Sequence, residues 1–170
     1  MREIEVSVSM EKLLINTERL IITELDETMI ESVYENSLDE DNRRFVPDEV
    51  FDTIEEAREA VLWIMSCYKQ ANVPLVYPIL LKSGENIGHV QIVPLKNEWE
   101  VGYHIAKKHT RAGYAAEALS AFLPIIMERL KLAEVVGIVD AENVASCTVL
   151  EKCGFVLEQK GSICRYLYRL

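Results

Sequence analysis

The segment that decides the fold is Lys107–Ala115, which reads KKHTRAGYA and lies between a strand-like run and a helical stretch. A helix N-terminus presents unpaired backbone N–H groups and about half a positive charge, so a loop that opens onto it is suited to phosphate. Gly113 has no Cβ to block a ligand, and the basic residues reverse the sign of charge locally in an acidic chain. Taken alone, a glycine turn flanked by solvated lysines is the more common structure.

Three strand-like runs precede this segment. Val76–Leu81 and Asn86–Val93 are separated by a serine–glycine turn signal, and Glu98–Ala106 follows them. Successive strands of this kind predict an antiparallel meander. An earlier strand is expected at Leu20–Thr23.

Helical patterns lie on both sides of the meander. Thr53 and Glu56 have the spacing of a capping box, so an amphipathic helix is expected to follow them. Asp26 is expected to cap a shorter helix near the N-terminus. Another helix is expected over Ala115–Leu130, in which Pro124 should kink or end the helix because its nitrogen carries no hydrogen to donate.

The C-terminal part alternates strand and helix. Glu134–Val139 is typical of a buried strand, Ala145–Cys153 of a helix, and Phe155–Glu158 with Ile163–Tyr168 of a terminal hairpin. Antiparallel strands early and a β-α-β-α-β order later predict an α/β (α+β) fold. We expect one mostly antiparallel mixed sheet with helices on both faces.

Length, charge and composition set further limits. At 170 residues, with no linker or repeat, we expect a single domain over 13–170 after a leader over 1–12 that is ordered only in part. The net charge of −10 argues against a nucleic-acid partner, which needs clustered Lys and Arg. No apolar run approaches a membrane span or a signal peptide, so we expect a cytoplasmic protein without a membrane partner. The cysteine spacing predicts neither a metal site nor a disulfide.

Five motifs occur in a fixed order along the chain. They are Thr17-Glu18-Arg19-Leu20, Ile87-Gly88, Glu100-Val101-Gly102-Tyr103, Gly113-Tyr114-Ala115-Ala116-Glu117-Ala118-Leu119, and Asn143-x-x-Ser146 followed by Leu150–Phe155. In this order they resemble the GNAT superfamily of acetyl-CoA-dependent N-acetyltransferases. Within it they resemble the branch of bacterial ribosomal-protein N-terminal (alanine/serine) acetyltransferases, and the resemblance spans nearly the whole chain.

The resemblance implies a GNAT-like acyl-CoA N-acyltransferase fold with a splayed pair of central parallel strands. These are the strand ending near Ile105 and the strand around Val135–Val139. Acetyl-CoA, the cosubstrate, would lie in the gap, with its pantetheine arm on strand backbone groups and its pyrophosphate on loop N–H groups. The residues implied in cofactor binding are Tyr103, His104, Ile105, Arg111, Ala112, Gly113, Tyr114, Ala115, Ala116 and Asn143.

The chain departs from the superfamily pattern in the loop and in the later helix. Many members begin the loop with Gln or Arg and have Gly at its second position, where this chain has Thr110 and Arg111. Many members also carry a helical tyrosine that protonates the departing thiolate, where this chain has Leu150. Ser146 takes that role in the branch the chain resembles.

Acetyl transfer to an amine needs a base, a donor for the oxyanion and a proton for the leaving sulfur. Glu100, on the central strand, is the predicted base, with Glu98 and His104 as lesser candidates. An ordinary solvated strand glutamate is the alternative for Glu100. Ser146 is predicted to protonate the thiolate or hold a CoA atom, and a serine favoured in a first helical turn is its alternative. The oxyanion donor is expected to be a backbone N–H near Ile105.

The predicted function is transfer of an acetyl group to a primary amine by direct attack on the thioester. The acceptor is open: a protein N-terminus, a polyamine, an amino acid or an amine drug. The acidic stretch 38–52 favours a cationic acceptor. Two other functions stay open, a non-catalytic acetyl-CoA-binding sensor or regulatory module and an unrelated nucleotide-binding protein. The sequence is compatible with either a monomer or a homodimer.

Overall fold

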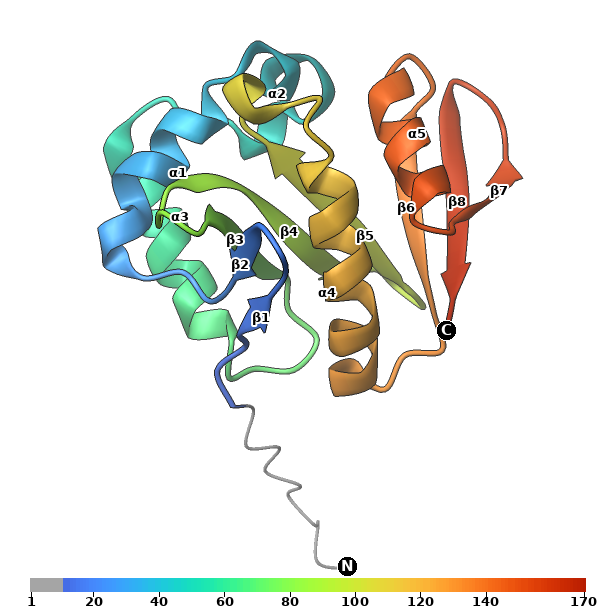
Figure 1. Ribbon diagram of the computed structural model, residues 1–170, viewed down its shortest axis with the longest axis horizontal. Coiled ribbons are helices and arrows are strands. Elements are labelled where there is room, and N and C mark those ends of the chain that lie inside the picture. Colours follow the sequence, from blue (N-terminus) through green and yellow to red (C-terminus); the bar gives the residue numbers. More distant parts are fainter. Residues whose placement is uncertain (1–10) are drawn as a thin grey trace, which may run out of the picture.

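The computed structural model describes residues 11–170 (Figure 1). The predicted leader, 1–12, therefore lies outside the described residues except for its last two. Within the described part, one sheet runs in the order β1-β2-β3-β4-β5-β6-β8-β7. Its strands are β1 Ile15–Asn16, β2 Leu20–Ile22, β3 Leu75–Leu81, β4 Asn86–Pro94, β5 Trp99–Ile105, β6 Glu134–Asp140, β7 Val156–Gln159 and β8 Ile163–Arg169.

All neighbouring strands of this sheet are antiparallel except β5 and β6, which are parallel. The mostly antiparallel mixed sheet, the parallel pair and the terminal hairpin of β7 and β8 are confirmed. The α-helices are α1 Ile30–Ser37, α2 Glu40–Phe45, α3 Ile54–Cys67, α4 Tyr114–Leu130 and α5 Val144–Lys152. Short 3-10 turns occupy η1 Glu27–Met29, η2 Pro47–Glu49 and η3 Lys107–His109.

Helices cover both faces of the sheet. On β5, Val101, Tyr103 and Ile105 point toward α4, because alternate residues of a strand point to the same side. Glu100 and His104 point to the other side, where α1 contacts β4 and packs on α3. We call these sides the α4 face and the α1 face. Helix α5 lies on the α4 face, since a Cβ on Gly137 of β6 would meet the side chain of Leu150.

The predicted helix caps are present. The Thr53 side chain accepts a hydrogen bond from the backbone N–H of Glu56 at 3.2 Å, and the Glu56 carboxylate accepts one from the N–H of Asp52 at 2.8 Å. Asp26 accepts from the N–H of Thr28 at 2.8 Å, which starts η1 just before α1. Two N-termini are therefore fixed by local side chains, as their sequence spacing predicts.

The predicted interruption of the second long helix at Pro124 is wrong in one respect, because α4 continues through it to Leu130. Loss of one N–H donor and the proline ring clash cost about 3 kcal/mol. Around Pro124, which is itself exposed, Phe122, Leu123 and Ile126 are fully buried. Burial of each contributes about 1.5–3 kcal/mol, so packing outweighs the proline penalty.

The polar stretch 38–52 contains α2 and η2, which its sequence pattern does not indicate. Its anchor is polar: the buried Asn42 donates its side-chain amide to the carbonyls of Asn36 at 3.2 Å and Ser37 at 3.3 Å. Without an apolar stripe, hydrophobic periodicity gives no signal for such a helix. The stretch lies at the end of the molecule where α4 begins (Figure 1).

Candidate functional site

Strands β5 and β6 separate along most of their length. Strand β4 pairs with β5 from Gly88↔Ile105 to Pro94↔Trp99, but β5 pairs with β6 only at Glu100↔Val136. The ribbons diverge from that point toward the N-termini of α4 and α5 (Figure 1). The backbone of β5 after Glu100 therefore has a free edge on this side, among the residues described.

The loop between β5 and α4 leaves a run of backbone donors unused. Within residues 11–170, the N–H groups of Arg111–Ala116 donate to no protein acceptor. Gly113 has φ 81° and Arg111 has φ 64°, both in the left-handed region. Successive N–H groups in such a loop and at a helix start form a concave site for an anion.

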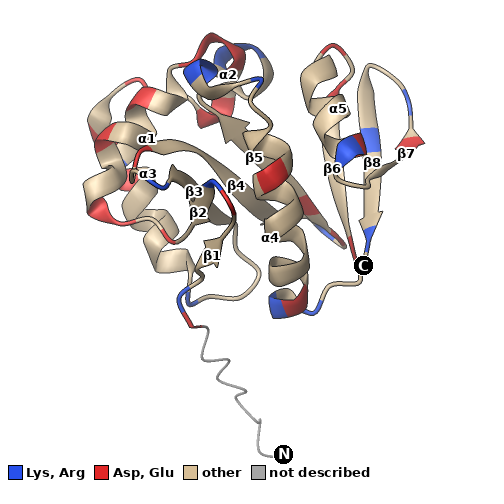
Figure 2. Ribbon diagram, in the orientation of Figure 1, with Lys and Arg blue, Asp and Glu red and all other residues tan. Residues whose placement is uncertain are grey.

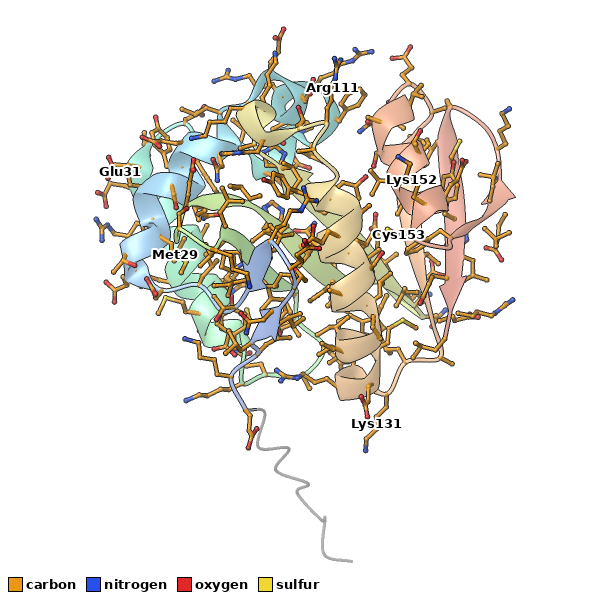
Figure 3. The ribbon with its side chains drawn as sticks, in the orientation of Figure 1. Met29, Glu31, Arg111, Lys131, Lys152 and Cys153 are labelled. Carbon is orange, nitrogen blue, oxygen red and sulfur yellow. The ribbon has the colours of Figure 1, made fainter. Side chains whose placement is uncertain are left out.

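The conformation of Arg111 explains why glycine is common at this loop position in the superfamily. A left-handed conformation costs an L-residue about 1–2 kcal/mol, and glycine avoids that cost. Thr110 contributes to the preceding turn, because its side chain donates to the carbonyl of Lys107 at 2.8 Å. Arg111 is exposed at the end of the molecule where α4 begins (Figure 3).

The other basic side chains of the loop have acidic neighbours. Lys108 Nζ lies 2.5 Å and His109 Nε2 3.0 Å from one Glu85 oxygen, and Lys107 Nζ lies 3.9 Å from a Glu40 oxygen. The local reversal of charge seen in the sequence is thus largely balanced in the fold. The backbone donors carry more of the anion-binding capacity than the lysines do.

The N-terminus of α5 lies across the strand gap, on the α4 face. Asn143 caps the helix, because its side-chain oxygen accepts from the N–H of Ser146 at 3.2 Å. The Ser146 hydroxyl lies 2.9 Å from the hydroxyl of Tyr103, and either group can donate. Burial raises the pKa of Tyr103 to about 12, so its hydroxyl keeps its proton at neutral pH. The sequence predicted only backbone contacts for Tyr103, and its side chain adds a hydroxyl pair.

Glu100 lies on the α1 face, opposite the hydroxyl pair. Burial raises the pKa of its carboxyl, and the negative charges of Glu49 and Glu98 raise it further. A carboxylate with a raised pKa is a stronger base than an ordinary surface glutamate. Glu98, the lesser candidate, is held differently: Arg165 donates to both of its oxygens, at 2.8 and 2.6 Å.

His104 belongs to a polar cluster on the α1 face. Its Nε2 lies 3.2 Å from Asp39 Oδ2, but the two atoms are not aligned for a hydrogen bond, and this buried nitrogen has no hydrogen-bond partner among the described residues. The same Asp39 oxygen accepts from the Lys107 N–H at 2.8 Å. Burial and the neighbouring His89 lower the pKa of His104, so the ring is neutral near pH 7. Asp39, in the segment before α2, therefore contacts both the end of β5 and the start of the loop that leads to α4.

Glu49 brings η2 onto the same face. Gln91 of β4 donates to one of its oxygens at 3.0 Å, and His89 Nε2 lies 3.6 Å from the other. Burial alone would raise the pKa of Glu49, but the contacts with His89 and Gln91 outweigh it, and the pKa is lowered. Glu49 and Glu100 thus form a pair of carboxyls with opposite pKa shifts.

The fold separates the predicted residues into two groups. Tyr103, Ser146 and the N–H groups of Arg111–Ala116 lie on the α4 side of the gap, whereas Glu100 and His104 point to the α1 side. The sequence placed Asp39 and Glu49 in an acidic stretch that favours a cationic acceptor, but it missed their contacts with side chains of β4 and β5. It also missed the role of the Tyr103 hydroxyl. It also assigned no role to Arg19 and Glu117, although both stand in motifs quoted for the resemblance.

Two absences apply to residues 11–170. No helix there is long and apolar enough to cross a membrane. No group of three or more His, Cys, Asp or Glu side chains in that range is arranged to hold a metal ion.

Comparison with known proteins places this geometry in a family. The model of the acetyltransferase (GNAT) domain matches residues 19–156, and the chain belongs to that family. It is 29% identical over 143 residues to the uncharacterized N-acetyltransferase YnaD of Bacillus subtilis, covering 82% of this chain and 81% of the relative. The crystal structure of a GNAT-family acetyltransferase from Bacillus anthracis is 26% identical, with a TM-score of 0.79 over 92% of this chain and 98% of that one.

A more distant structure has the same fold with a ligand bound. RimL, a ribosomal L7/L12 alpha-N-protein acetyltransferase in complex with coenzyme A, is 18% identical, with a TM-score of 0.79 over 93% of this chain and 98% of that one. The protein is accordingly an acetyltransferase of the GNAT family. The sensor alternative gains no support from these relatives.

Proposed function

We propose that this enzyme acetylates a cationic primary amine by direct attack of the amine on acetyl-CoA. Glu100 acts as general base, and Ser146 with Tyr103 supplies the proton for the leaving thiolate. The observation that carries the proposal is the placement of a desolvated carboxyl and a hydroxyl pair on opposite faces of β5, beside a strand gap. A thioester in that gap would have a base on one side and an acid on the other.

The unused N–H groups of Arg111–Ala116 support the cosubstrate position. Their dipoles and the start of α4 suit the pyrophosphate of CoA. The free edge of β5 at Tyr103, His104 and Ile105 suits the amide groups of pantetheine, which take the place of a neighbouring strand. Asn143 contributes by fixing the first turn of α5 and with it Ser146.

The proton transfers follow from the two pKa shifts. Glu100 accepts a proton from the acceptor's ammonium, which frees the nitrogen lone pair for attack on the thioester carbon. The new C–N bond forms, the C–S bond breaks, and the sulfur leaves with the electron pair. Ser146 donates its proton to that sulfur and recovers one from Tyr103, whose raised pKa keeps it protonated before the transfer. The nitrogen gives up its second proton to solvent as the amide forms, and Tyr103 takes a proton back from solvent. Glu100 then releases the first proton, so that one proton is released for each acetyl group transferred.

The acceptor enters from the α1 face in this proposal. Glu49 stays ionised and lies near enough to Glu100 to raise its pKa, so a cationic group is favoured there. Acidic residues are also frequent on the helices over this face (Figure 2). Peptide N-termini, polyamines and amine drugs are cationic acceptors of this kind.

Thiol release from acetyl-CoA tests the proposal with a panel of amines. We expect release with at least one cationic amine and lower rates with acidic amino acids. An acidic acceptor with the best turnover would contradict the cationic assignment. Tight acetyl-CoA binding without thiol release for any amine would contradict the catalytic function.

A further inference from the structure

The turn between the first two strands reaches the loop that precedes α4. Strand β2 contacts α4, and the two lie side by side in Figure 1. The turn residues Thr17 and Arg19 make their contacts with the first turn of that helix and with the residues on each side of Gly113. These contacts join parts of the chain that are far apart in sequence.

Glu117 is the point of attachment. One of its oxygens accepts from the Thr17 hydroxyl at 2.6 Å and from the Arg19 backbone N–H at 3.1 Å. The other accepts from Arg19 Nε at 2.6 Å and lies 2.6 Å from Arg19 Nη2. Burial alone would raise the pKa of Glu117, but these bonds outweigh it and lower the pKa, so the carboxylate stays charged.

Arg19 extends from Glu117 to the loop itself. Its Nη1 donates to the carbonyl oxygen of Ala112 at 2.9 Å, and its guanidinium lies 4.4 Å from the centroid of the Tyr114 ring. One side chain therefore contacts the residue before Gly113, the residue after it, and Glu117 one turn into α4. Lysine offers no such planar fork, because its ammonium is a single point of charge.

The bond to Ala112 sets the direction of a backbone donor. In a trans peptide the C=O and the next N–H point in opposite directions. With the Ala112 carbonyl held by Arg19, the N–H of Gly113 points away from Arg19, among the unused donors of Arg111–Ala116. The same contact restrains a loop in which Arg111 and Gly113 both adopt left-handed conformations.

We propose that Arg19 is a positioning residue for cosubstrate binding, which it serves by holding the pyrophosphate loop through Ala112, Tyr114 and Glu117. The inference rests on the proposed use of that loop to bind CoA. Arg19 acts through the loop, so its effect on binding is confined to acetyl donors that carry a pyrophosphate. Backbone N–H groups that are already held in position bind the pyrophosphate more tightly, because less conformational freedom is lost on binding.

The test compares two acetyl donors in wild type and variants. Acetyl-CoA carries the pyrophosphate, whereas S-acetylpantetheine lacks it. For Arg19→Met we expect a CoA Kd raised roughly tenfold, the KM for acetyl-CoA raised similarly, and kcat within about twofold. The kcat/KM for S-acetylpantetheine should stay within about twofold of wild type. Arg169→Met is the matched control, since it removes a surface pair with Glu134 (3.0 Å) and should leave both donors unaffected.

Two milder variants keep the test decisive if Arg19→Met does not fold. Arg19→Lys and Glu117→Gln should each raise the CoA Kd roughly threefold to fivefold. The double variant should lose less binding free energy than the two single variants added together, because the two residues contact each other. Unchanged CoA affinity in both, or equal losses with both acetyl donors, would overturn the role of Arg19. Wild-type protein that fails to bind CoA would instead contradict the proposed function.

Discussion

The two faces of β5 present different kinds of site. On the α4 face, the candidate cosubstrate site consists mainly of backbone N–H groups and a strand edge, with the Tyr103 and Ser146 hydroxyls beside it. On the α1 face, Glu100 and His104 sit in a cluster of side chains from η2 and the segment before α2. A backbone site needs a glycine and a helix start. A side-chain site needs particular residues brought together from distant segments.

This difference gives different sensitivities to substitution. Loss of one carboxyl on the α1 face removes a whole chemical function. Loss of one loop side chain on the α4 face leaves the N–H groups in place. The effects of substitution should therefore be largest at Glu100, smaller at the hydroxyl pair of Tyr103 and Ser146, and smaller again at Gly113 in the loop. They should be smallest at Glu49.

The largest effect is expected for Glu100→Gln. The amide keeps the size of the side chain but accepts no proton, so kcat/KM should fall about 100-fold or more, with the CoA Kd unchanged. Steady-state thiol release and calorimetry measure the two quantities. Glu98→Gln is the matched control and should lose less than about threefold, because Glu98 is held by Arg165. Equal losses in the two variants would contradict the assignment of the base.

The pH dependence sharpens the same assignment. Glu100 must be ionised to accept a proton, and its pKa is raised above the ordinary value of 4.5. The kcat/KM should thus rise with pH through that raised pKa and level off above it. The acidic limb should vanish in Glu100→Gln. A wild-type limb that is retained in the variant would assign the titration to another group.

Removal of the hydroxyl pair should have the next largest effect. Ser146→Ala and Tyr103→Phe each delete one hydroxyl while the packing stays, so kcat should fall roughly tenfold in each. Affinity for CoA should change by less than about twofold. The double variant should be close to the worse single one, since the pair acts as a unit. Full activity in Ser146→Ala would remove it from the mechanism.

A smaller effect is expected in the loop. Gly113→Ala places an L-residue at φ 81°, at a cost of about 1–2 kcal/mol, so the CoA Kd should rise several-fold. Gly84→Ala is the matched control, because Gly84 has φ 92° in a hairpin turn with open space around it. Both variants should lose similar thermal stability, but only Gly113→Ala should lose CoA affinity. Similar affinities in the two variants would argue against the loop site.

The smallest effect is expected for Glu49→Gln. It removes one charge from the α1 face while the contact with Gln91 can persist, so the KM for a cationic acceptor should rise about threefold. The KM for a neutral amine should not change, and Glu40→Gln, at an exposed position, serves as control. An equal rise for charged and neutral amines would indicate a packing effect instead.

The sequence predicted the α4 face better than the α1 face for a physical reason. Gly113 and the helix start are local features, and the positions of Glu100 and Tyr103 on opposite sides of β5 follow from alternation along one strand. The contacts of Asp39 and Glu49 join segments separated by much of the chain. Nothing in the local pattern around either residue indicates a partner on β4 or β5.

The helix predictions differ for a similar reason. The α3 N-terminus follows from its capping box, whereas α2 depends on the buried amide of Asn42 and has no apolar stripe. Pro124 predicts a break from local chemistry alone, but the burial of Phe122 and Ile126 is a tertiary effect that overrides it. Local signals identify elements, and long-range packing decides whether they persist.

The single register pair between β5 and β6 makes amide exchange and thermal stability depend on the cosubstrate. Strands β1–β5 and β6–β8 form two ladders that meet through the main chain only at Glu100↔Val136, among the residues described. An incomplete ladder exposes amide hydrogens to exchange with solvent. Backbone amides on the facing edges of β5 and β6 should therefore take up deuterium quickly in the free protein and slowly once acetyl-CoA lies in the gap between the two strands. Ligand concentration would then set the melting temperature of the whole sheet.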